Sequence, residues 1–252
     1  MTVLIFLAEK DLSDLGKLEG LLQKTFTDME FPLNGPSTGA KFPYLFKTEG
    51  VLCTMMHMEA PAPLRSSDPE IRNAVLWPNA WDDIRKHQAH LVISVAGGNS
   101  PYNRAIVLQR IVGAVFEVEP SAIGTAYPYS GALLSKRAVG AALTSYEHVC
   151  APLFISCFFA REPPGTVSDT GISVSTKGLS EFGLMDVEAR HFTGSVHELH
   201  QFIFCLGGYL IEERPNIRDG DTIGLSAEQK IQVKFERSMY YPHIVYRLYF
   251  PH

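Results

Sequence analysis

His90-Leu-Val-Ile-Ser-Val-Ala96, followed by Gly97-Gly98 and Ser100-Pro101, is the stretch that decides the fold of the first half of the chain. The run up to Ala96 is rich in β-branched residues, which pack well in a buried strand. The two glycines mark a turn, and Ser100 can cap a helix in which Pro101 takes the first position. We therefore expect a core strand that leads through a tight turn into a long helix reaching Phe116.

The residues before this strand alternate between apolar runs and helical periodicity. Leucines at three- and four-residue steps predict an amphipathic helix over Asp11–Phe26. Asp68-Pro69 predicts the start of a second helix, which Pro78 interrupts before it resumes up to His87. The expected strands are Val3–Leu7, Phe42–Phe46, Val51–Met58 and His90–Ala96. In chain order these elements read β-α-β-β-α-β, the ferredoxin-like order.

The rest of the chain predicts a second α+β part. Arg161–Gly171 holds the strongest cluster of Gly and Pro, so we place the boundary there, between an N-terminal subdomain at 1–161 and a C-terminal subdomain at 165–252. Ser195 and Glu198 form a capping-box pattern at the start of a helix that reaches Glu213. Further strands are expected in the N-terminal subdomain at Ala122–Tyr127 and Pro152–Ala160. In the C-terminal subdomain they are expected at Ile172–Ser175, Val187–His191, Lys230–Phe235 and Ile244–Phe250. The predicted fold class is α+β, with mixed or antiparallel sheets packed against helices.

Composition limits the partners of the chain. Its 252 residues carry a net charge of −5, so no basic field covers the sequence to bind nucleic acid or an anionic membrane surface. The first ten residues lack the basic region of a signal peptide, and no apolar run approaches the roughly 18 residues of a membrane span. We expect a cytoplasmic protein with neither a nucleic-acid nor a membrane partner.

The four cysteines carry no sign of metal or redox chemistry. Cys53, Cys150, Cys157 and Cys205 lie in apolar surroundings and form no Cys-x-x-Cys pair. Such residues behave as small hydrophobic side chains in a core. The sequence therefore predicts buried free thiols, which are typical of a reducing compartment.

Three short motifs approach catalytic or metal-binding patterns, and each lacks a required residue or spacing. In His197-Glu-Leu-His200 the second histidine comes one residue too early for a zincin, although the pair could still hold a metal together with His191. Gly97-Gly-Asn-Ser-Pro101 matches neither phosphate-binding glycine pattern, and Asp219-Gly-Asp-Thr-Ile-Gly224 departs from the EF-hand loop. We predict no catalytic residue, no metal and no cofactor.

Several segments are similar to a known family. Phe182-Gly-Leu-Met-Asp-Val-Glu188, the Ser195–Glu213 helix and Asp219–Gly224 with the following Ser226-Ala-Glu-Gln-Lys-Ile-Gln-Val resemble the bacterial domain-of-unknown-function family 4261. Trp77-Pro-Asn-Ala80 and His87-x-x-His90 resemble the part that often precedes this domain. Such domains occur near polymorphic and type VI secreted toxins, and some members are regarded as immunity proteins. The resemblance implies a cytoplasmic protein that binds and neutralises a cognate toxin, and its acidic charge suits a basic, nuclease-type toxin.

The expected binding surface consists of acidic and aromatic positions near predicted loops. These residues are Trp77, Asn79, Asp82, Asp83, His87, Glu212, Glu213, Asp219 and Asp221. One alternative is a small-molecule-binding protein or an enzyme, in which Trp77, Asn79, His87 and His90 form a pocket and the histidines do acid-base work. Another is a structural scaffold or homo-oligomer.

Overall fold

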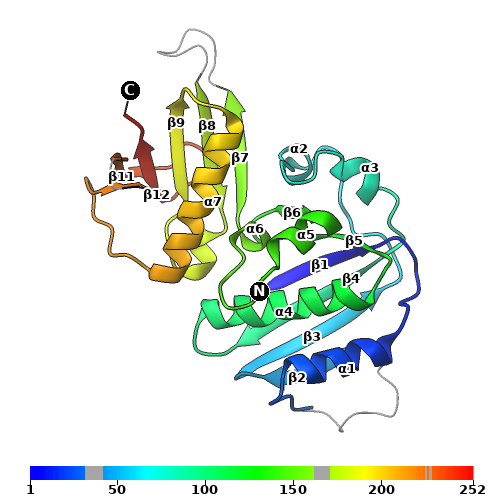
Figure 1. Cartoon of the computed structure of the whole chain (residues 1–252). Coiled ribbons are helices and arrows are strands. Elements are labelled where there is room, and N and C mark those ends of the chain that lie inside the picture. Colours follow the sequence, from blue (N-terminus) through cyan, green and yellow to red (C-terminus); the bar gives the residue numbers. More distant parts are fainter. Residues whose placement is uncertain (32–41, 162–170, 225, 227–228, 252) are drawn as a thin grey trace. The chain divides into compact units, whose positions relative to one another are not determined.

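The computed structural model describes residues 1–31, 42–161, 171–224, 226 and 229–251 (Figure 1). The chain divides into two compact units, Met1–Leu153 and Phe154–His252. Each unit contains one six-stranded sheet. The predicted α+β class is confirmed in both units.

The first unit is built on the ferredoxin-like order, with elements other than those expected. The sheet order is β2-β3-β4-β1-β5-β6, and every neighbouring pair is antiparallel. Its strands are β1 (Thr2–Leu7), β2 (Tyr44–Thr48), β3 (Val51–Met58), β4 (Ala89–Gly97), β5 (Ala122–Tyr127) and β6 (Ala132–Ser135). The β-α-β-β-α-β unit consists of β1, α1 (Leu15–Thr25), β3, β4, α4 (Pro101–Val118) and β5. Strands β2 and β6 extend its two edges.

The segment from Asp68 to His87 is helical on both sides of Pro78 as expected, but its two helices are much shorter than the predicted ones. It contains only two short helices, α2 (Pro69–Arg72) and α3 (Ala80–Ile84). The chain leaves the helix at Asn73, and Pro78 cannot donate the backbone hydrogen bond that a continuous helix needs. The long helix predicted after Ser100 is present, and the Ser100 hydroxyl accepts a hydrogen bond from the Asn103 amide at 3.1 Å, with Pro101 in the first position.

The two faces of the first sheet are covered by different elements. Figure 1 shows α1 and α4 on one face, against which Val3, Ile5 and Leu7 of β1 are fully buried. Alternation along β1 turns Phe6 to the other face. There the α2–α3 segment packs down as one apolar cluster, formed by Phe6, Ala62, Trp77, Ala80, Ile84, Ala126 and Leu133. This segment therefore fixes the surroundings of Trp77 and His87, two of the residues predicted to form the binding surface.

The second unit has a mixed sheet and one long helix. The order is β10-β11-β12-β9-β8-β7, in which β9 and β12 pair in parallel and the other neighbours are antiparallel. The strands are β7 (Ser156–Arg161), β8 (Ile172–Lys177), β9 (Val187–Phe192), β10 (Thr222–Ile223), β11 (Ile231–Arg237) and β12 (Ile244–Tyr249). Its helices are the 3-10 helix η1 (Leu179–Phe182) and α7 (Val196–Glu213), whereas α5 (Lys136–Ala142) belongs to the first unit and α6 (Ala151–Phe154) spans the boundary in the sequence. The predicted capping box of Ser195 and Glu198 at the start of α7 is present.

The division between the units lies earlier than the boundary that the breaker cluster suggested. Most of that cluster, residues 162–170, falls outside the described residues. In the sequence, the boundary between the compact units falls between Leu153 and Phe154. Strand β7, which we placed at the end of the subdomain 1–161, pairs along its length with β8. Its backbone hydrogen bonds therefore place it in the second unit.

The cysteines differ from the prediction at one position. Cys53, Cys150 and Cys157 are buried, whereas Cys205 on α7 is exposed. Burial raises the pKa of Cys53 to about 12 and that of Cys150 to about 11. Only a thiolate reacts readily with a disulfide reagent, so Cys205 is the thiol expected to react.

This difference gives a direct labelling prediction. In the native protein at neutral pH, a thiol-specific disulfide reagent should modify one cysteine per chain rapidly and the other three only after unfolding. Mass spectrometry of the labelled protein gives the number and position of the modified residues. The Cys205→Ser variant should show no rapid phase, and rapid labelling of this variant would contradict the burial described.

Candidate functional site

The five candidate residues of the first unit fall into two groups. Trp77, Asp83 and His87 line one cavity of about 410 Å³. Asn79 and Asp82 are exposed and do not line it. The Asp82 carboxylate instead lies 3.2 Å from Nε of Arg85, one turn along the chain. The structure thus brings three of the five residues together.

The inner wall of the cavity is apolar and tightly packed. Trp77 is 4% exposed, and its ring lies 6.4 Å from that of Phe6, measured between centroids. Its indole N–H donates a hydrogen bond to Asp83 Oδ2 at 2.8 Å. Gly124 of β5 leaves room for the indole, because a Cβ built there would lie 2.3 Å from a ring carbon of Trp77. The indole is therefore held in one orientation.

His87 is placed as a structural side chain. Its Nε2 accepts a hydrogen bond from the Ala62 amide at 2.6 Å, and its Nδ1 bonds to the carbonyl oxygen of Ile84. An amide donor at Nε2 requires that the proton be on Nδ1. Burial lowers the pKa of His87, which favours this neutral form. With both nitrogens engaged, the imidazole has no free position for acid-base work on a ligand.

His90 lies outside the cavity. Its Nδ1 bonds to the Ala60 carbonyl oxygen at 2.7 Å, which ties β4 to the chain that follows β3. The pocket of Trp77, Asn79, His87 and His90 that we considered thus contributes only Trp77 and His87 to the cavity. The two histidines therefore do not face this cavity together.

Three cations at the cavity were missed by sequence reasoning. Lys86, Lys136 and Arg137 line it and are exposed. The half-buried Ser135, which caps α5, also lines it. Lys136 donates to the Pro120 carbonyl oxygen at 2.9 Å. Within the described parts of the chain, Lys86 and Arg137 form no ion pair within 4.0 Å. These residues form no sequence motif. Lys136 and Arg137 at the start of α5 reach Lys86, which follows α3, only because β5 and β6 pair.

The four acidic candidates of the second unit belong to local structure. Glu212 and Glu213 are the last two residues of α7. The Asp219 carboxylate accepts a hydrogen bond from the Phe235 amide at 2.7 Å, and that of Asp221 accepts one from the Arg218 amide at 2.8 Å. Both aspartates therefore fix the turn that leads into β10 and β11. Of the nine candidates, the structure thus brings three together at one cavity, Trp77, Asp83 and His87.

A buried charge network in the second unit was not predicted. Glu188 of β9 is 1% exposed, and its Oε2 lies 3.3 Å from Nη2 of Arg190 and 3.6 Å from Nη1 of Arg247. The parallel register of β9 and β12 sets Arg247 directly beside Glu188. The Ser238 hydroxyl donates to Glu188 Oε1, so the carboxylate also holds the start of the β11–β12 connection. Buried charges are retained only where they are paired in this way.

The same network fixes Ser238–Ile244, which we call the 238–244 turn. The Ser238 hydroxyl oxygen accepts hydrogen bonds from the amides of Tyr240 and Tyr241, both at 3.0 Å. The Ser238 amide donates to the His243 carbonyl oxygen at 2.9 Å, and the rings of Tyr241 and His243 are stacked. A short turn with this many internal contacts is preorganised. It leaves Met239 at 63%, Tyr240 at 50% and Ile244 at 48% exposure.

Asp186 adds a second buried carboxylate near the turn. It accepts hydrogen bonds from the Leu179 amide at 3.1 Å and the Thr176 hydroxyl at 3.2 Å. Its Oδ2 lies 3.9 Å from Nε2 of His243. Burial raises the pKa of Asp186, although these hydrogen bonds oppose the shift. Asp186 and Glu188 are the two acids of the Phe182–Glu188 segment, and both face inward because they anchor other parts of the unit.

The histidines of His197-Glu-Leu-His200 do not form a metal site. His197 is exposed, whereas the buried His200 packs its ring 4.5 Å from that of Phe204, measured between centroids. Among the described residues, no three His, Cys, Asp or Glu side chains are grouped so that they could hold one ion.

In the part of the chain that the structure describes, no helix is long and apolar enough to cross a membrane.

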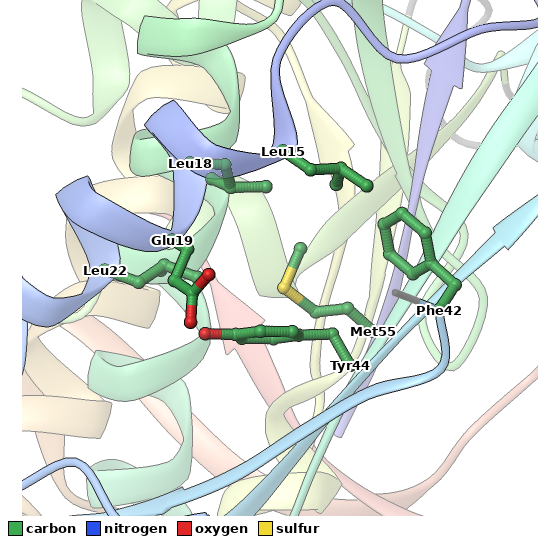
Figure 2. A pocket seen from close by; sticks show the side chains of 7 residues that line it. All are labelled: Leu15, Leu18, Glu19, Leu22, Phe42, Tyr44 and Met55. Carbon is green, nitrogen blue, oxygen red and sulfur yellow. The ribbon is translucent and has the colours of Figure 1, made fainter. Parts of the chain in front are cut away.

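A second, smaller hollow lies between α1 and the β2–β3 hairpin. Figure 2 shows Glu19 of α1 pointing at the Tyr44 hydroxyl, with Leu15, Leu18, Leu22, Phe42 and Met55 around them. Burial and the negative charge of Glu19 raise the pKa of Tyr44. The volume is about 10 Å³, room for one water molecule at most. This hollow is a packing defect under α1 and no ligand site.

Comparison with known proteins gives one match, which covers part of the second unit. The family model described as "Domain of unknown function (DUF4261)" matches residues 175–249. No curated protein and no solved structure matches the chain. The resemblance of the Phe182–Glu188 segment and of α7 to this family is thereby confirmed. The matched residues contain Asp186, the Glu188 network and the whole 238–244 turn.

Proposed function

We propose that the chain is a cytoplasmic immunity protein, which binds a cognate toxin protein through the 238–244 turn and has no catalytic role. The observation that carries the proposal is the set of large side chains exposed on that turn, Met239, Tyr240 and Ile244. They lie in the segment that matches the family model. Met and Tyr are enriched in protein interfaces and depleted on ordinary surfaces.

The rigidity of the turn supports a docking role. An interface residue that is already ordered loses little conformational entropy on binding, so more of its contact energy appears as affinity. Here Ser238 and the Glu188 carboxylate hold the turn before any partner arrives. Exposed aromatic and Met side chains on such a support are the kind of anchor that dominates binding energy.

The charge of the chain favours a basic partner. The net charge of −5 would speed the encounter with a positively charged protein, such as a nuclease that must itself approach phosphates. Acidic residues on both units would contribute to this field, including the exposed Asp82, Glu213, Asp219 and Asp221. Their effect would be on the association rate, and it would decrease with salt concentration.

The proposal is tested by binding to a candidate toxin, the product of a toxin gene encoded beside the gene of this chain. Isothermal titration with the purified toxin should give a complex, and Tyr240→Ala should weaken it about 30-fold, the effect of losing an interface anchor of about 2 kcal/mol. Tyr209→Ala is the matched control, because Tyr209 is an equally exposed tyrosine on α7, at 47%. Failure of the wild-type protein to bind, or equal losses for both variants, would refute docking through the turn.

A further inference from the structure

We propose that the cavity of the first unit is a binding site for a small molecule that combines a flat apolar ring with an anionic group. This site is independent of the 238–244 turn, because all its lining residues lie in Met1–Leu153. The volume of about 410 Å³ is within the usual range for small-molecule sites, roughly 300–1,000 Å³. The apolar wall of the cavity, its three cations and the neutral His87 indicate the class of the ligand.

The apolar half of the ligand is indicated by the inner wall. Trp77 is held in place by Asp83 and by the close approach of Gly124, and Ala122, Ile123 and Pro120 complete the wall. A fixed indole beside aliphatic side chains suits the face or edge of a flat ring. Because the indole N–H is already bonded to Asp83, this wall offers the ligand no polar partner.

The anionic half is indicated by an excess of positive charge. Lys86, Lys136 and Arg137 line the cavity, whereas Asp83 is its one carboxylate and already accepts from Trp77. His87 adds no charge, because its pKa is lowered and both its nitrogens are bonded within the protein. Three cations around one cavity stand out in a chain whose net charge is −5. A carboxylate or phosphate would pair with Lys86 and Arg137 through charge-assisted hydrogen bonds.

The test uses 8-anilinonaphthalene-1-sulfonate as an anionic, flat probe, and N-phenyl-1-naphthylamine as its uncharged counterpart. The Trp81→Phe variant of the full chain leaves Trp77, in the cavity wall, as the only tryptophan. Quenching of its fluorescence therefore reports binding of the probe, and variants of the residues that line the cavity then locate the bound probe. We expect the sulfonate probe to quench Trp77 at saturation with a dissociation constant at least about 10-fold below that of the neutral probe, the contribution of the ionic contacts.

Variants separate this site from unspecific apolar binding. In the same background, Lys86→Gln with Arg137→Gln should raise the dissociation constant of the sulfonate probe about 10-fold and leave that of the neutral probe unchanged. Arg85→Gln is the matched control, since Arg85 is an exposed neighbour of Lys86 that does not line the cavity. All three replaced side chains are exposed, so the thermal midpoints should agree.

Competition then identifies the anionic group. Phenyl phosphate and benzoate should displace the sulfonate probe, and the stronger of the two identifies the ligand as a phosphate or a carboxylate. Benzyl alcohol, which keeps the ring but lacks the charge, should displace it at least about 10-fold less well. The proposal is overturned if neither anion displaces the probe, if the neutral probe binds equally well, or if Arg85→Gln weakens binding as much as the double variant.

Discussion

The Glu188→Gln substitution is expected to destabilise the second unit by about 3–5 kcal/mol, the cost of breaking one side of a buried charge pair. Glutamine has nearly the same shape, so the loss is electrostatic and not a cavity. The substitution would leave Arg247, which is 5% exposed, beside Arg190 without the carboxylate that now pairs with both. Arg247 has no second acid within ion-pair distance in the described residues. Two like charges would then face each other in a buried part of the sheet.

Hydrogen exchange measures this loss strand by strand. Amides of β9 and β12 in Glu188→Gln should exchange at a denaturant concentration well below that for the wild-type protein. Both tryptophans, Trp77 and Trp81, lie in the first unit, so their fluorescence serves as an internal control for unfolding elsewhere. Glu213→Gln, at an exposed position at the end of α7, should change stability by less than about 0.5 kcal/mol. Equal effects of the two substitutions would show that the network contributes nothing.

The Gly124→Ala substitution should destabilise the first unit by about 3 kcal/mol, the upper part of the range for overpacking a core. A Cβ at this position would lie 2.3 and 2.4 Å from two ring carbons of Trp77 and 2.6 Å from the Leu134 carbonyl oxygen. The indole cannot simply move, because Asp83 and Phe6 hold it. The carbonyl oxygen belongs to β6, which pairs with β5. The added methyl group must therefore displace either the tryptophan or the strand.

Gly140→Ala is the matched control in the same unit. Nothing lies within 4 Å of a Cβ built at Gly140, and the residue is inside α5. Alanine in a helix interior is favoured over glycine by about 0.5–1 kcal/mol, so this variant should be slightly more stable. Urea unfolding followed by tryptophan fluorescence compares the two. A Gly124→Ala protein as stable as the wild type would mean that Trp77 is free to move.

Local signals in the sequence were reliable where one short segment contains all the information. Ser100 and Pro101 start α4 as expected, and Ser195 with Glu198 starts α7, because capping depends on residues within one turn. Strands β1 and β4 were predicted from their β-branched composition, and both are present. The order β-α-β-β-α-β was anticipated with other elements. In the structure β3 and β4 are its middle strands and α4 and β5 its last two elements, whereas we had expected β4 to be the last strand.

The candidate site could be predicted only in part, because its residues meet through long-range pairing. Trp77, Asp83 and His87 are close in sequence, and the structure does bring them to one cavity. Lys136 and Arg137 reach it only after β5 and β6 have paired, which no local pattern encodes. In the second unit, Arg247 meets Glu188 through a parallel pairing of β9 with the last strand. One sequence alone does not show the register in which two such distant strands pair.

The most direct measurement of the proposed function, neutralisation of a toxin by binding through the 238–244 turn, is survival of bacteria that produce a candidate toxin encoded beside the gene of this chain. Co-production of the wild-type chain or of Tyr209→Ala should restore growth, whereas Tyr240→Ala at the same protein level should restore it poorly. Immunoblotting confirms that the three proteins are present in equal amounts. If the wild-type chain gives no protection, or if Tyr240→Ala protects as well as the wild type, the proposed function through this turn is wrong.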